Sequence, residues 1–162
     1  MKAFLKPFDE LQDINELKDR LQKHNREYFE LSGVTSSGKA QVIYGISGVS
    51  EHSLVVVSDD LKAKELYEEL SFYRDDVYIF PGKDMLFFQS DIRGNALTIP
   101  RVNVLARMVS GESFVVIATI DSMLNVLQKP DEWAKGIHEL KVGDEIDTKS
   151  FARELSAEGY ER

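Results

Sequence analysis

The chain has 162 residues, of which 43% are hydrophobic and none is cysteine, and its 28 acidic and 20 basic residues give a formal net charge of -8. This length and composition suffice for one compact domain with a filled core, and the lack of cysteine excludes disulfides, thiolate zinc sites and cysteine nucleophiles. The acidic balance disfavours independent binding to nucleic-acid phosphates. No apolar run approaches the roughly 18 residues of a membrane span, and the N-terminal stretch "MKAFLKPFDELQD" lacks the apolar run of a signal peptide, so we expect a cytoplasmic protein.

Apolar residues recur at helical spacing near the N-terminus, at Leu11, Ile14, Leu17 and Leu21. This period predicts an amphipathic helix over roughly residues 9–29. The segment "EYFELSG" (27–33) is predicted to be a short strand, followed by the loop "GVTSSGKA" (33–40) and a helix that opens at Gly38.

Strands and helices then alternate. We expect strands in "HSLVVVSDD" (52–60), "DVYIF" (76–80) and "SFVVIATID" (113–121), and helices in residues 59–73, 100–111 and 121–129. The apolar runs of the first and last strands predict burial on both faces of a parallel sheet. Asp59 or Asp60 is expected to cap the first of these helices, and Asp121 or Ser122 the last. This alternation predicts an α/β domain with right-handed crossovers.

The pattern changes after "QKPDEWAKG". Residues 137–147 are expected to form a strand and a turn, and "TKSFARELSAEGY" (148–160) a helix that ends at Gly159. We therefore expect an α/β domain over residues 1–136 and the start of a small α+β domain over 137–162. Because no closing strand follows, we expect the chain to be an excised fragment.

The loop "GVTSSGKA" matches the phosphate-binding pattern G-x-x-x-x-G-K-[ST] except at its last residue. Gly33, Gly38 and Lys39 are candidate cofactor-binding residues, because glycines let backbone N–H groups face phosphates and the lysine neutralises their charge. Ala40 lacks the hydroxyl that would ligate magnesium. Three interpretations stay open: a decayed, structural loop; a weak nucleotide site without efficient hydrolysis; and a chance match.

An alternative enzymatic interpretation is a small P-loop NTPase or kinase that uses Lys39 with Asp59 or Asp121, since each acid follows an apolar strand. Helix capping by these acids is the competing interpretation. We expect no catalytic residue and no metal ligand in the chain. His24, His52 and His138 lie in different segments and do not predict a metal cluster.

Two further groups could serve recognition. Leu86, Phe87 and Phe88 lie among turn residues and either pack under a loop or form a patch for another domain. Arg93, Arg101 and Arg107 could follow nucleic acid, but the acids around them favour ordinary surface charge.

Together, "GVTSSGKA", "LVVVSDDLKAKELYEEL", the blocks from Lys83 to Leu124 and "LKVGDEID...ARELSAEGYER" resemble the N-terminal UvrB-like region of the bacterial transcription-repair coupling factor family (Mfd). The resemblance extends from about Phe8 to Arg162. It implies a RecA-like domain that has lost ATPase function, because UvrB keeps a threonine where this chain has Ala40.

The resemblance also implies partners and cofactors. The parent protein would be a DNA-dependent ATPase that removes stalled RNA polymerase and recruits UvrA for nucleotide-excision repair. ATP and magnesium would act in separate translocase domains, and RNA polymerase and DNA would bind other domains. UvrA would be recruited by the small domain that begins at about Ile137. The resemblance assigns no UvrA-contact residue in this chain.

Overall fold

The computed structural model describes residues 10–23, 26–82, 98–124, 127, 129–135, 138 and 140–157, and the chain divides into two compact units, Met1–Val126 and Leu127–Arg162. All buried residues of the described ranges lie in the first unit, which therefore holds the core. The residues Leu86, Phe87, Phe88 and Arg93 lie outside the described ranges. None of the helices in these ranges has the length and apolar character that a membrane crossing needs.

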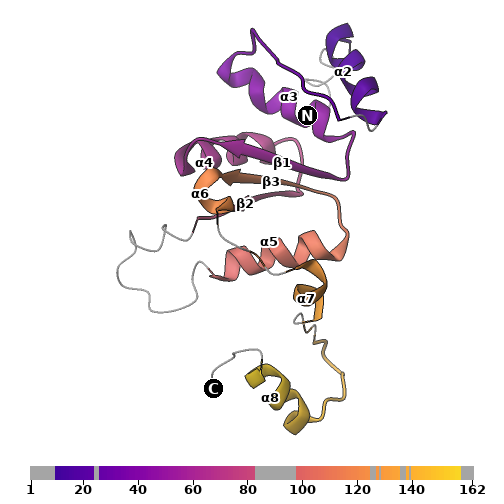
Figure 1. Cartoon of the computed structure of the whole chain (residues 1–162), viewed down its shortest axis with the longest axis vertical. Coiled ribbons are helices and arrows are strands. Elements are labelled where there is room, and N and C mark those ends of the chain that lie inside the picture. Colours follow the sequence, from indigo (N-terminus) through magenta and orange to yellow (C-terminus); the bar gives the residue numbers. More distant parts are fainter. Residues whose placement is uncertain are drawn as a thin grey trace. The chain divides into compact units, whose positions relative to one another are not determined.

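The first unit is built on a parallel sheet of three strands in the order β1-β3-β2 (Figure 1). The strands are β1 (His52–Val57), β2 (Val77–Phe80) and β3 (Phe114–Thr119). They lie in the segments whose β-branched and aromatic residues predicted strands. The chain passes from β1 to β2 through α4 (Asp60–Ser71) and from β2 to β3 through α5 (Thr98–Ser110). The predicted α/β class with a parallel sheet is confirmed, and the arrangement is consistent with a RecA-like, UvrB-like domain.

Different helices cover the two faces of the sheet. Side chains alternate along a strand, so Val115 and Ile117 of β3 share one face, where they form a buried cluster with Leu70 of α4. The other face meets α5, whose Arg101 guanidinium lies 4.0 Å from the centre of the Phe80 ring. Covered from both sides, β3 is buried at all of its positions, as predicted.

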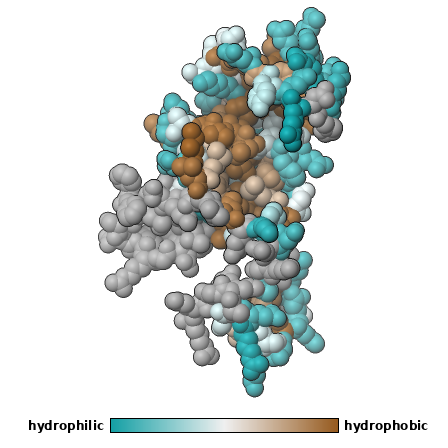
Figure 2. Space-filling view, in the orientation of Figure 1, coloured by the Kyte–Doolittle hydropathy of each residue, from teal (hydrophilic) through white to brown (hydrophobic). Residues whose placement is uncertain are grey.

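The prediction that β1 is buried on both faces is wrong. Leu54 and Val56 pair in register with Val116 and Ala118 of β3, on the face that carries α5. Because α5 packs against β2 and β3, these two side chains of the edge strand stay 59% and 48% exposed. Figure 2 shows apolar surface gathered in this region, over β1, β3 and α6 (Ile120–Met123).

The N-terminal helix is shorter than predicted. α2 spans Gln12–Gln22 rather than residues 9–29, because the polar run "QKHNRE" that follows Leu21 offers no apolar face to bury. The strand predicted over residues 27–33 is also wrong: these residues belong to no strand, and Tyr28 is fully exposed.

Arg20 of α2 contacts this non-strand segment twice. Its Nη2 lies 2.8 Å from Glu27 Oε2, and its guanidinium lies 4.6 Å from the centre of the Phe29 ring. The segment 27–32 is therefore fastened to α2 by an ion pair and a cation–π contact.

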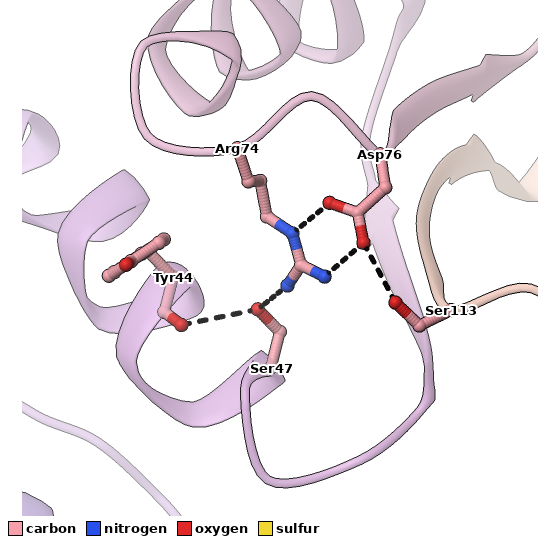
Figure 3. A network of polar contacts seen from close by, with 5 residues as sticks. All are labelled: Tyr44, Ser47, Arg74, Asp76 and Ser113. Carbon is pink, nitrogen blue, oxygen red and sulfur yellow. Dashed lines mark hydrogen bonds and ion pairs between the residues drawn. The ribbon is translucent and has the colours of Figure 1, made fainter.

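A polar network joins the starts of β2 and β3 to the end of α3 (Lys39–Ser47) (Figure 3). Arg74 Nε and Nη2 donate to Asp76 Oδ1 and Oδ2 at 2.5 and 2.6 Å, and Arg74 Nη1 donates to Ser47 Oγ at 2.7 Å. Ser113 Oγ, next to β3, donates to Asp76 Oδ2 at 3.1 Å. The hydrogen bonds from Arg74 hold the pKa of Asp76 below its usual value.

The second unit contains α7 (Pro130–Lys135) and α8 (Thr148–Ala157). The helix at α8 was predicted; α7 was not, although Pro130 at its first position is a known start signal. The strand predicted in residues 137–147 is absent from the described part of that range. The turn predicted in the same range is present: Lys141 N donates to Asp144 Oδ2 at 2.7 Å, and Gly143 adopts φ +106°.

Candidate phosphate-loop site

The candidate loop, residues 33–40, folds into a tight turn that uses its own amides. Thr35 begins the 3-10 helix η2 (Ser36–Gly38), and the Gly38 N–H donates both to Thr35 O at 3.0 Å and to Thr35 Oγ1 at 3.2 Å. The Lys39 N–H donates to Ser36 O. A phosphate loop directs such amides toward its ligand. Here two of them are satisfied within the loop.

The two glycines of the loop differ in what they do. Gly33 has φ +77°, a left-handed conformation that favours glycine. Gly38 has φ -83° and ψ -16°, which any residue adopts. A Cβ on Gly38 would lie 3.1 Å from Thr35 Oγ1, so this glycine makes room for the Thr35 cap rather than for an unusual backbone.

Ala40 occupies the position of the missing hydroxyl, and its side chain is part of the core. It is 1% exposed and belongs to the same buried cluster as Leu70 and Val115. A hydroxyl at this position would therefore lie among apolar side chains.

Lys39 borders a hollow of about 360 Å³ at the carboxyl end of β1. The hollow is lined from the loop and α3 by Ser36, Lys39 and Ile43, from β1 and its end by Val55, Val56, Val57 and Ser58, and from α4 by Lys62, Glu65, Leu66 and Glu69. The formal charges of its two lysines and two glutamates cancel. Lys62 Nζ also lies 2.9 Å from Glu65 Oε2, a contact that raises the pKa of Lys62. The lining therefore lacks the excess of positive charge that concentrates a polyphosphate.

Asp59 caps a helix and does not line this hollow. Its Oδ1 accepts from the Lys62 N–H at 2.9 Å, and its Oδ2 accepts from Ser58 Oγ at 2.7 Å. The Ser58 hydroxyl, followed by the Lys62 amide, lowers the pKa of Asp59. The prediction that Asp59 or Asp60 caps this helix is confirmed at Asp59.

Asp121 lies in the first turn of α6 and is also absent from the lining of the hollow. The predicted cap at Asp121 or Ser122 is wrong, because Thr119 is the N-cap. Thr119 leaves β3 in an extended conformation, and its hydroxyl accepts from the Ser122 N–H while Ser122 Oγ accepts from the Thr119 N–H. In the described part of the chain, no ion pair joins Lys39 to Asp59 or Asp121.

The described residues contain no group of three histidines or acids that could hold a metal ion. The ring centres of His52 and Phe114 lie 4.5 Å apart, and the His138 ring meets the Phe151 ring edge-on with the centres 5.3 Å apart. His24 lies outside the described residues. Both described histidines thus make aromatic contacts.

Arg101 has a role that the sequence interpretation as surface charge missed. Its side chain is buried, stacks on Phe80 and donates to Pro81 O and, at 3.5 Å, to Ser122 O. Burial lowers the pKa of Arg101. The guanidinium thus joins the carboxyl ends of β2 and β3. Arg101 lies three and four residues before the buried Val104 and Leu105, and this helical spacing could have revealed from the sequence that Arg101 is buried.

Comparisons with known proteins give two kinds of relative. The chain is 26% identical to the UvrABC system protein B of Metamycoplasma arthritidis over 95% of this chain and 26% of that protein. It is 24% identical to the transcription-repair-coupling factor of Staphylococcus epidermidis over 94% of this chain and 13% of that protein. For the factor of Bacillus subtilis the identity is 21%, over 100% of this chain and 14% of that protein.

The chain thus spans about a quarter of the UvrB relatives and about a seventh of the coupling factors that it matches. No protein-family model matches the chain, and no solved structure does. UvrB proteins and transcription-repair-coupling factors are therefore its homologues over nearly its whole length, and its α/β fold is consistent with the UvrB-like region of a coupling factor.

Proposed function

We propose that this chain is the UvrB-like region of a transcription-repair coupling factor, and that it serves nucleotide-excision repair as a non-catalytic scaffold. The names of its relatives support a role in this repair system. The proposal that the chain is non-catalytic rests on the conformation of the loop at residues 33–40. The amides of Gly38 and Lys39 bond within the loop, and Ala40 packs in the core. Phosphoryl transfer depends on positioned donors and a metal ion, so a loop of this kind is poorly suited to it.

The partners and cofactors of the parent protein belong to the same proposal. UvrA would contact the domain that begins at about Ile137. RNA polymerase, DNA, and ATP with magnesium would act through other domains of a cytoplasmic parent. These assignments rest on the resemblance and on the names of the relatives.

ATP turnover by the purified chain tests the proposal. We expect its rate, with magnesium and with or without DNA, to equal that of Lys39→Ala, because no described group completes a hydrolytic site around Lys39. The UvrB protein of a relative serves as a positive control in the same assay. Turnover that Lys39→Ala abolishes would refute the proposal.

The alternative, a small NTPase that uses Lys39 with Asp59 or Asp121, makes a distinct prediction. Asn is as good a helix cap as Asp, so Asp59→Asn keeps the start of α4 while removing the carboxylate. The alternative requires this variant to lose turnover that the original chain shows. No contact described above favours it.

A further inference from the structure

Arg101 is a buried cation that uses only part of its hydrogen-bonding capacity. Its Nη1 donates to Pro81 O and to Ser122 O, and its guanidinium lies over the Phe80 ring. The Nε and Nη2 donors of Arg101 meet no acceptor among the residues that the structure describes. Every N–H group of a guanidinium is a donor, so one side of Arg101 is left for a ligand.

These unpaired donors face an opening in the surface. In the described part of the chain, every fully buried side-chain nitrogen or oxygen has a hydrogen-bond partner. Because Arg101 Nε and Nη2 have none, they belong to the small accessible part of a residue that is 8% exposed. The edge formed by Nε and Nη2 presents two parallel N–H groups, an arrangement that binds both oxygens of one carboxylate.

Uncharged groups hold the guanidinium in place. It lies where the carboxyl ends of β2 and β3 converge, since a Cβ on Gly82 would be 3.9 Å from Ser122 N. Burial alone lowers the pKa of Arg101, so neither a carboxylate nor a second cation of the described residues acts on it. A buried cation without a counter-ion is unfavourable, and an incoming carboxylate would supply that counter-ion.

We propose that this edge of Arg101 binds an Asp or Glu side chain of a protein partner, whose flanking apolar residues pack on α6 and the residue after it. α6 follows β3 at its carboxyl end (Figure 1), and Ile120, Met123 and Leu124 are 59%, 41% and 75% exposed. Met123 directly follows Ser122, whose carbonyl accepts from Arg101. The apolar surface thus begins next to the cation. This interaction surface goes beyond the proposed function and does not depend on it.

A nucleic-acid backbone fits this surface less well than a protein segment does. Phosphates are bound by several cations in a row, whereas Arg107, the other arginine of α5, is paired with Glu112 and lies 5.0 Å from the centre of the Tyr78 ring. The formal net charge of -8 also repels phosphates. Exposed aliphatic side chains beside a single arginine are typical of a protein interface.

The side-chain Nε–H signal of Arg101 in proton–nitrogen NMR spectra of the full chain tests the site. The probes are a capped Leu-Glu-Leu tripeptide, its matched Leu-Gln-Leu control, and dimethyl phosphate, all at constant ionic strength. We expect the Glu tripeptide to shift the signal of Arg101 and to leave that of Arg107 in place. Its affinity should be at least roughly tenfold above that of the Gln tripeptide and of dimethyl phosphate, because its hydrogen bonds join two charged groups.

Met123→Ser tests the apolar part of the surface. This variant should weaken binding of the Glu tripeptide roughly threefold and leave the binding of acetate unchanged, because acetate has no side chain to bury on α6. An unmoved Arg101 signal, or equal affinities of the two tripeptides, would overturn the carboxylate site. Tighter binding of dimethyl phosphate would assign Arg101 to a nucleic acid instead, and an unchanged tripeptide affinity in Met123→Ser would overturn the role of α6.

Discussion

At the scale of single residues, Ala40 links the candidate phosphate loop to the hydrophobic core. At 1% exposure it completes the packing between α3, α4 and the sheet, so the position faces the core rather than a ligand. The loop keeps its glycines and its lysine; Gly33 turns the chain, and Gly38 leaves room for the Thr35 cap.

Replacing Ala40 separates volume from polarity. Ala40→Val should lower the free energy of unfolding by about 1–3 kcal/mol through overpacking. Ala40→Thr has nearly the same shape and should cost about 1 kcal/mol more, because its hydroxyl is buried among apolar groups. Urea unfolding measures both variants. If Ala40→Thr were instead the more stable of the two, or gained magnesium-dependent nucleotide binding, the loop would be a damaged site rather than a scaffold.

Arg101 is the counterpart on the other face of the sheet. It is a charged residue that sequence context assigned to the surface, yet its guanidinium satisfies Pro81 O and Ser122 O beneath α5. Composition cannot reveal such a role, because the acceptors are backbone carbonyls that any sequence supplies. Only the position of Arg101 on the buried stripe of α5 points to it.

At the level of elements, the Asp76 network links the starts of β2 and β3 to the end of α3. Arg74, Asp76, Ser47 and Ser113 come from three separate parts of the chain, and Asp76 accepts from two of the others. Asp76 thereby fixes where β2 and β3 begin relative to each other and, through Arg74, to the end of α3.

Asp76 should make stability depend on pH in a defined direction. Because its pKa is lower in the folded chain than in the unfolded one, its charge stabilises the fold above the unfolded pKa of about 3.9. That contribution disappears as the pH falls through the lower folded pKa. Asp76→Asn should therefore cost about 1–2 kcal/mol at pH 7, and its difference from the original chain should shrink below about pH 4.

The neighbouring Asp75 provides the control for this prediction. It is exposed and adjacent in sequence, so Asp75→Asn tests the loss of a carboxylate outside the network. Urea unfolding of both variants between pH 7 and pH 3 measures the difference. An Asp76→Asn cost that stayed constant over this range would show that its charge contributes nothing.

Sequence periodicity located the elements well and their environments less well. The β-branched runs placed β1, β2 and β3, and Asp59 marked the start of α4. The exposure of Leu54 and Val56 could not be predicted, because it depends on which strand takes the middle of the sheet and on where α5 packs. The segment 27–33 was expected to be a strand from its place before the loop, but pairing partners are a property of the fold and not of the segment.

For the whole molecule, the two compact units are unequal in what they bury. Every buried residue of the described ranges lies in Met1–Val126, whereas the described residues of Leu127–Arg162 are exposed or half-buried. The proposal that the second unit begins a UvrA-binding domain stays a prediction. We expect the core of the first unit to form without the second unit, because all of its described buried residues lie before Leu127.

A chain ending at Val126 tests this independence. We expect its urea midpoint and its free energy of unfolding to match those of the full chain within about 0.5 kcal/mol, because the buried side chains are all retained. Circular dichroism should show the loss of the helical signal of α7 and α8 and no more. A drop of several kcal/mol would mean that the second unit contributes to the core.

The strand order β1-β3-β2 also sets a sequence of events during synthesis. In the described sheet, each outer strand takes its hydrogen bonds from β3, which is the last of the three to leave the ribosome. Until residues 114–119 emerge, β1 and β2 lack the strand with which both pair in the described sheet, and their aliphatic side chains stay exposed to water. Nascent chains shorter than this would be the natural clients of a chaperone that binds extended apolar segments.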